Sequence, residues 1–131
     1  MAEYFMKPLT HEWVVKAEGD FASAQRELRA RKFPNYDAAC FHSQQCVEKY
    51  LKARLQEADI SFTKTHDLSV LLDLLAPIEP EWQTLSPALR LLNAFAVEVR
   101  YPGQAADKEM ALDAVSICKD IREIVRKSLG L

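Results

Sequence analysis

One predicted helix carries four side chains that could bind a phosphorylated ligand, and they recur at i, i+3, i+7 and i+10. These residues are His42, Gln45, Lys49 and Lys52. At about 100° per residue they form one stripe, separate from the apolar stripe that includes Cys40. An imidazole, a carboxamide and two ammonium groups can hold a phosphate through charge-assisted hydrogen bonds. The alternative is a solvated face whose lysines pair with Glu48 or with neighbouring helices, and the spacing leaves both open.

Two more groups with this chemistry lie further along the chain. In Thr65-His66-Asp67, the histidine stands at a predicted helix start, where it can donate to a phosphate or act as an acid or base. Alternatively, Thr65 and Asp67 only cap that helix. Arg100 and Tyr101 precede a Pro-Gly turn, where a guanidinium can fork onto a phosphate and a tyrosine can stack or hydrogen bond. The arginine can instead satisfy the last carbonyls of a helix.

Composition indicates an ordinary globular domain. The chain has 131 residues, 49% hydrophobic and 27% charged, and is expected to bury roughly two-thirds of its unfolded surface. The formal net charge of -2 gives no global attraction to nucleic acid, so such binding would need a local patch. We expect a cytoplasmic protein without membrane contact, because neither a signal-peptide pattern nor a membrane-length apolar run is found. The three cysteines are predicted to be buried free thiols.

Proline and glycine positions predict a single all-α domain over residues 1–131. Only three glycines occur, and six prolines divide the chain into long segments free of helix breakers. The expected helices cover residues 10–32, 35–58, 65–76, 86–99 and 107–128, with a helical turn around 81–85. We therefore predict an antiparallel up-down bundle of four main helices plus one short helix.

Cations crowd the end of the first predicted helix. They are Arg26, Arg29, Arg31 and Lys32. Cations stabilise the negative end of a helix dipole and are readily solvated at the surface, which accounts for this cluster without a ligand. The cluster could also be a phosphate patch. Glu79 and Glu81, in a proline-bounded connector, are interpreted as solubilising charges.

Several kinds of site are not indicated. The chain has no Gly-rich phosphate loop, no HExxH motif and no Cys/His spacing typical of zinc. We therefore expect no metal and no cofactor.

Three motifs, in this order, resemble the HEPN domain: ACFHSQQCVEKYLKARL at 39–55, THDL at 65–68 and RYP at 100–102. The resemblance covers roughly residues 10–128. It implies an up-down bundle of four to five helices that forms homodimers, with a polar cleft that binds nucleotides or, in other branches, cleaves RNA. HEPN proteins are often encoded beside a minimal nucleotidyltransferase, which is the partner that the resemblance implies. Carried over by position, the motif residues are Lys49, Lys52, His66, Asp67, Arg100 and Tyr101.

One departure from the family pattern concerns catalysis. The ribonuclease branch carries Arg-x(4–6)-His, whereas here Arg100 is followed by YPGQAAD and no histidine occurs after His66. The acid or base needed for cleavage at a 2′-hydroxyl is therefore missing from that place, which argues against an enzyme. His66 could substitute only if the fold brings it beside Arg100.

The leading hypothesis is a dimeric HEPN module that binds a nucleotide or polyphosphate and acts with a nucleotidyltransferase, as in a toxin–antitoxin pair. The alternative is a metal-independent endoribonuclease that uses Arg100 and His66. A third hypothesis is a helical dimerisation subunit whose polar stripe docks the nucleotidyltransferase.

Overall fold

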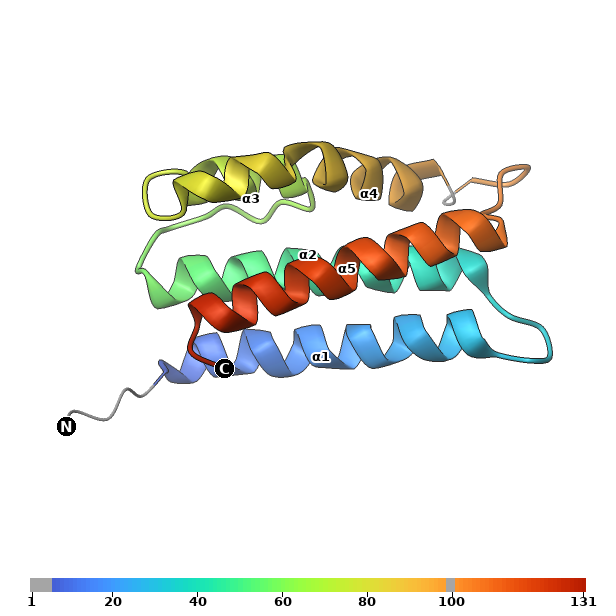
Figure 1. Ribbon diagram of the computed structural model, residues 1–131, viewed down its shortest axis with the longest axis horizontal. Helices are drawn as coiled ribbons and strands as arrows, with labels where there is room; N and C mark the ends of the chain where they lie inside the picture. Colours follow the sequence, from blue (N-terminus) through green and yellow to red (C-terminus); the bar gives the residue numbers. More distant parts are fainter. Residues whose placement is uncertain (1–5, 99–100) are drawn as a thin grey trace.

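Helix α2 (Tyr36–Glu57) is the central element of the bundle, and the other helices pack around it. The computed structural model describes residues 6–98 and 101–131. The remaining elements are α1 (Pro8–Arg29), α3 (Leu68–Leu75), the 3-10 helix η1 (Pro80–Leu85), α4 (Ser86–Glu98) and α5 (Lys108–Ser128). Figure 1 shows the long helices running up and down along one axis. The predicted all-α up-down bundle is confirmed, and no strand occurs within the described ranges.

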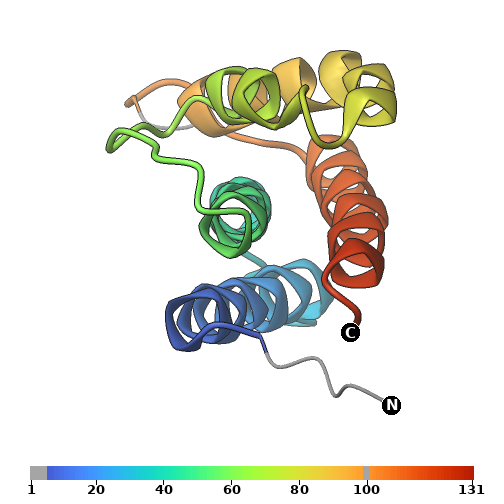
Figure 2. The same ribbon diagram turned by 90° about the vertical axis from the view of Figure 1, so that its left-hand side faces the viewer.

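An end-on view explains why α2 is so thoroughly buried. Figure 2 shows α1 on one side of α2, α5 on a second, and the layer formed by α3 and α4 on a third. Tyr50, Leu51 and Leu55 of α2 are fully buried. Each such side chain removed from water contributes roughly 1.5–3 kcal/mol, so the packing of α2 is a main source of stability. The segment between α2 and α3 crosses the side of α2 that faces away from α5 (Figure 2).

Three polar residues start helices where the sequence predicts a start. The side chains of Asn35, Asp67 and Asp107 accept hydrogen bonds of 2.8–2.9 Å from backbone amides in the first turns of α2, α3 and α5. Each bond satisfies a donor that a helix otherwise leaves without a partner. Local chemistry therefore sets these three boundaries.

The first helix ends three residues earlier than predicted, at Arg29 instead of Lys32. Ala30 has an extended backbone with ψ 126°, and Phe33 adopts a left-handed φ of 52°. Phe33 precedes Pro34, and a residue before proline is disfavoured in the right-handed helical region. The chain therefore leaves the helix before the proline rather than at it.

A charged network ties α1, α2 and α5 together. Tyr50 donates to Glu18 at 2.7 Å, and Arg122 donates to both carboxylate oxygens of Glu18 at 2.6 and 2.7 Å. Arg126 donates to the Tyr50 hydroxyl at 3.1 Å. The bonds from Arg122 hold the pKa of Glu18 below its usual value, and burial raises the pKa of Tyr50. The three helices are thus held together by a hydrogen-bonded polar cluster as well as by apolar packing.

The interpretation of Glu79 as a solubilising charge is wrong. Its carboxylate accepts a 2.6 Å bond from Ser128 and a 3.2 Å bond from Arg54. Burial acts to raise the pKa of Glu79, but these hydrogen bonds outweigh it and lower the pKa overall. Glu79 therefore fastens the η1 connector to α2 and to the end of α5.

The thiols of Cys40, Cys46 and Cys118 are all free and buried, as predicted. None of the helices in the described ranges is long and apolar enough to cross a membrane.

Candidate functional site

The polar stripe of α2 meets a carboxylate from α1. Asp20 accepts from both His42 and Lys49, with His42 Nδ1 2.8 Å from Oδ1 and Lys49 Nζ 2.5 Å from Oδ2. His42 and Lys49 are seven residues apart, so two helical turns bring them to one side of α2. Asp20 is 9% exposed, so a buried carboxylate holds two partly exposed side chains.

A second cluster lies at the start of α3. Glu48 of α2 is 3% exposed and accepts from His66 Nδ1 at 2.8 Å and from Lys52 Nζ at 3.1 Å. The Lys52 ammonium also lies over the rings of Trp13 and Phe62, at 5.5 and 5.9 Å from their centroids. Lys52 is therefore enclosed by a carboxylate and two aromatic rings, and its role as a ligand-binding residue stays a prediction.

The two clusters have the same set of partners around a carboxylate, which the sequence did not predict. In each, one carboxylate binds one lysine and the Nδ1 of one histidine, so two carboxylates balance two ammonium groups. A neutral imidazole that donates from Nδ1 keeps Nε2 as an acceptor. Among the described residues, neither His42 nor His66 makes a hydrogen bond through Nε2. Both imidazoles are thus oriented by a carboxylate and can still bind a ligand or transfer a proton.

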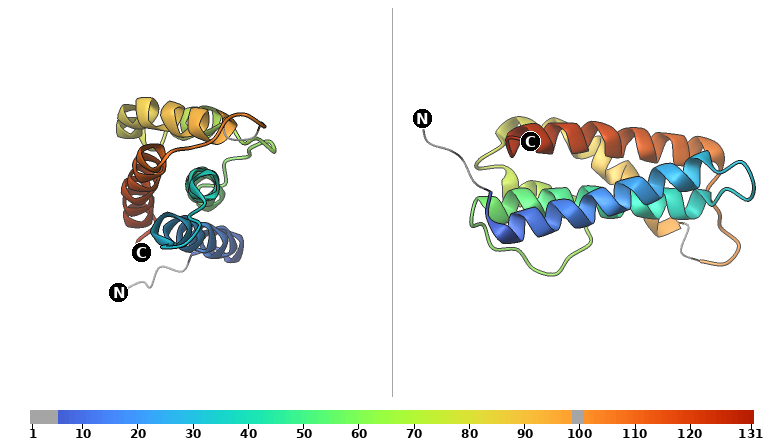
Figure 3. Two further views of the ribbon diagram at one scale, coloured as in Figure 1. Left: turned by 90° about the vertical axis from the view of Figure 1, so that its right-hand side faces the viewer. Right: turned by 90° about the horizontal axis from the view of Figure 1, so that it is seen from below.

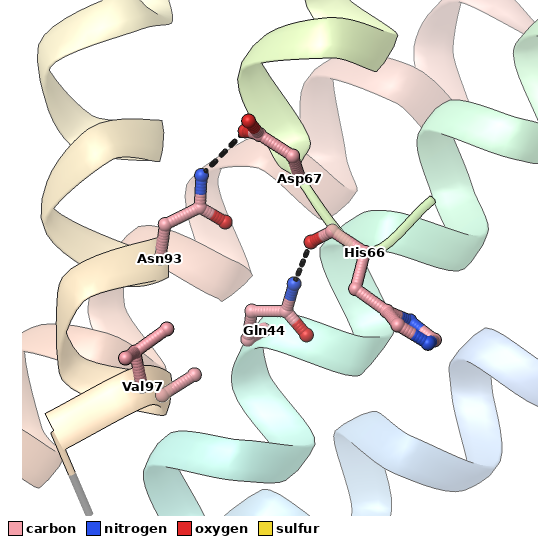
Figure 4. A pocket seen from close by; sticks show the side chains of 6 residues that line it. Gln44, His66, Asp67, Asn93 and Val97 are labelled. Carbon is pink, nitrogen blue, oxygen red and sulfur yellow. Dashed lines mark hydrogen bonds between the residues drawn. The ribbon is translucent and has the colours of Figure 1, made fainter. Parts of the chain in front are cut away.

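A pocket of about 320 Å³ opens beside the second cluster, between α2, the start of α3, and α4. It is lined by Gln44, His66, Asp67, Asn93, Ala96 and Val97. Figure 4 shows Gln44 and Asn93 facing the segment that carries His66 and Asp67. Gln44 Nε2 donates to the His66 carbonyl at 2.7 Å, and Asn93 Nδ2 donates to Asp67 at 2.9 Å (Figure 4). Ala96 and Val97 add an apolar wall, so the pocket combines polar edges with an apolar surface.

The fold brings most of the predicted site residues to the region around α2. Gln45 donates to Gln44 at 2.8 Å, which connects the stripe to the pocket. Tyr101 is 64% exposed in the connection that follows α4. Arg100 lies outside the described residues.

Sequence reasoning missed four residues that hold the site together: Asp20, Gln44, Glu48 and Asn93. Gln44 lies one helical turn after Cys40, so its spacing predicts a place on the apolar stripe; it is buried there, but its carboxamide turns toward the pocket. Glu48 was considered only as a lysine partner, although it also binds His66. For Asp20 and Asn93 the sequence gives no signal, because each acts on residues more than twenty positions away.

Within the described residues, no group of three or more His, Cys, Asp or Glu side chains could hold a metal ion.

The fold and these clusters define a small up-down helical bundle with a polar site on its second helix. A family model of the HEPN domain matches residues 10–128, and the chain belongs to the HEPN family. The structure is similar to the crystal structure of TT1696 from Thermus thermophilus, at 26% identity and a TM-score of 0.74, covering 92% of this chain and 98% of that one. It also shares its fold with ST0689, an archaeal HEPN homologue, at 24% identity and a TM-score of 0.68, covering 91% and 96% of the two chains. No curated protein matches.

Proposed function

We propose that this HEPN protein is a nucleotide-binding module whose base and ribose occupy the pocket between α2, α3 and α4. The observation that carries the proposal is the lining of that pocket. Carboxamides from Gln44 and Asn93 can read the polar edge of a base, and Ala96 and Val97 can contact its face. The Asp67 carboxylate suits ribose hydroxyls.

The charges around the pocket suggest how the phosphates are bound. Lys49 and Lys52 are already paired with carboxylates, so they offer little net positive charge to a polyphosphate. His66, whose Nε2 makes no hydrogen bond within the described residues, and Arg100, by the family resemblance, are the groups assigned to the phosphates. Arg100→Ala should therefore weaken binding without unfolding the protein.

Calorimetric titration with ATP tests the proposal. The wild type should release or absorb heat on binding, whereas Val97→Trp should abolish the signal because the larger side chain fills the pocket. Val15→Trp is the matched control, since Val15 is similarly exposed, at 56% against 50%, but lies on α1 outside the pocket. A wild type that gives no heat with ATP or GTP would end the proposal.

A second function is favoured by the two histidines, each held at Nδ1 by a carboxylate. In a metal-independent endoribonuclease, one Nε2 would take the proton of the 2′-hydroxyl while that oxygen attacks phosphorus. The other imidazolium would protonate the departing 5′-oxygen, and Arg100 would stabilise the charged phosphorus centre.

Cleavage of single-stranded RNA in the presence of EDTA checks this second function. Activity should disappear in the His66→Ala, Arg100→Ala double variant and fall in His42→Ala. Cleavage that persists in the double variant would trace to a contaminating nuclease rather than to this site.

The family resemblance also supplies the partners that we propose: a second copy of the chain and a nucleotidyltransferase, with the toxin–antitoxin pair as one such arrangement. The partly exposed Leu91 and Val97 on α4 offer apolar surface to such a partner. Light scattering on the purified chain, alone and with the candidate nucleotidyltransferase, measures both associations.

A further inference from the structure

The last turn of α1 and its connection to α2 carry a cluster of exposed cations beside an exposed aromatic ring. We call it the basic tip, and it consists of Arg26, Arg29, Arg31, Lys32 and Phe33. All five residues are exposed, and Phe33 is 95% exposed. Figure 3 shows this connection at one end of the bundle, beyond the ends of the packed helices. The proposed nucleotide pocket and the two histidine clusters do not use any of these residues.

The cations of the basic tip are not neutralised within the described parts of the chain. Arg29, Arg31 and Lys32 make no ion pair or side-chain hydrogen bond there, and Arg26 donates only to Ser23, at 3.3 Å. Residues 26–32 hold four cations and a single carboxylate, Glu27, in a chain whose net charge is -2. The tip is therefore a local positive surface on an otherwise acidic protein.

A shallow hollow of about 380 Å³ extends the tip along the outer side of α1. It is lined by Ala22, Gln25, Arg26, Arg29 and Ala30. The two alanines, one turn before Arg26 and directly after Arg29, add no long side chains to this lining. An extended polyanion can therefore approach both arginines at once.

The backbone holds Phe33 in a conformation that bulky residues rarely adopt. Its φ of 52° destabilises the fold by roughly 1–2 kcal/mol. Because the ring is almost fully exposed, its packing does not offset this destabilisation. An exposed aromatic ring next to arginines is suited to stacking on a flat ligand.

We propose that the basic tip binds single-stranded nucleic acid, with the arginines on successive phosphates and a base stacked on Phe33. Three of the four cations are arginines, whose planar forks match phosphate oxygens. An anionic membrane is the less suitable partner, because Phe33 is flanked by Lys32, Pro34 and Asn35 rather than by further large apolar residues that could insert.

Fluorescence anisotropy with a labelled oligouridylate of about 12 nucleotides tests the proposal directly. The full chain should bind it, with an affinity that falls with salt at a slope of about -2 to -3 on logarithmic axes, as expected for three to four phosphate contacts. Arg29→Glu, Arg31→Glu should abolish binding. The control Lys16→Glu, Lys119→Glu changes the net charge equally at exposed positions away from the tip, and should retain most of the binding.

Substitutions of Phe33 separate stacking from simple apolar contact. Phe33→Trp should keep the affinity, whereas Phe33→Leu and Phe33→Ala should lower it by about 5- to 150-fold because they remove the aromatic face. Circular dichroism would confirm that each variant keeps its helices.

Three results would overturn the proposal. One is the absence of oligouridylate binding by the full chain. Another is oligouridylate binding whose affinity changes neither in the Arg29→Glu, Arg31→Glu variant nor in Phe33→Ala. The third is a chain that does not bind the oligonucleotide but binds phosphatidylserine vesicles through the tip, with vesicle binding preserved in Phe33→Leu. That result would assign the tip to membranes. The Val97→Trp variant should bind the oligonucleotide normally, so a failed nucleotide pocket and a failed tip give different results.

Discussion

At Glu18, three hydrogen-bond donors from two other helices converge on one carboxylate. Because the Arg122 guanidinium lowers the pKa of Glu18, the ionised form is favoured in the folded state. A carboxylate whose folded pKa lies below its unfolded value stabilises the protein above the unfolded pKa. That contribution is lost as the pH falls through the folded pKa.

Glu18→Gln should therefore destabilise the protein near neutral pH by about 1–3 kcal/mol, since it removes charge-assisted bonds. The difference from wild type should shrink as the pH falls through the lowered folded pKa of Glu18, because the wild-type carboxylate then also becomes protonated. Urea denaturation at a series of pH values measures this. Glu12→Gln, at an exposed position of the same helix, is the control, and an equal loss at every pH would contradict the assigned cause.

At the scale of single elements, Asp67 connects the start of α3 to α4. Its Oδ1 accepts from the Ser69 amide and from Asn93 Nδ2, both at 2.9 Å. Asp67→Ala should cost about 1–2 kcal/mol through the lost cap, and hydrogen exchange should show faster opening of α3. Ser86→Ala, at the start of α4, is the control and should leave hydrogen exchange in α3 unchanged. If hydrogen exchange in α3 is also unchanged in Asp67→Ala, the prediction is refuted.

The turn between α1 and α2 is an element with stored strain. Glycine adopts a positive φ without steric cost, so Phe33→Gly should raise the free energy of unfolding by about 1 kcal/mol, while nucleic-acid binding should weaken as in Phe33→Ala. Thermal denaturation measures the gain. A fall in melting temperature would show that the Phe33 ring stabilises the fold after all.

At the scale of the whole molecule, the core hides every thiol. Cys40, Cys46 and Cys118 are completely buried, and burial together with Asp37 raises the pKa of Cys40 to about 11. Because thiolates are the reactive form, a disulfide reagent at pH 8 should modify the native protein only as fast as the bundle opens. All three thiols should react at once in concentrated guanidinium chloride. Immediate reaction of any thiol in native buffer would show that part of the core opens independently.

The sequence was sufficient for the elements, because their causes are local. Periodic apolar residues such as Ala114 and Cys118 define the buried side of α5, and Asn35, Asp67 and Asp107 start helices through bonds to amides two or three residues away. The HEPN motifs likewise lie in continuous stretches of chain, so family membership was readable from residue order. The stripe of His42, Gln45, Lys49 and Lys52 follows from helical spacing alone.

Only the tertiary structure decided what those side chains contact. Asp20 lies on a different helix from His42 and Lys49. The rings of Trp13 and Phe62, both distant in sequence, enclose the Lys52 ammonium. The pocket beside His66 exists because α4 places Asn93 and Val97 opposite α2. Such pairings depend on how helices distant in sequence pack, and helical periodicity fixes which way a side chain points but not which neighbour it meets.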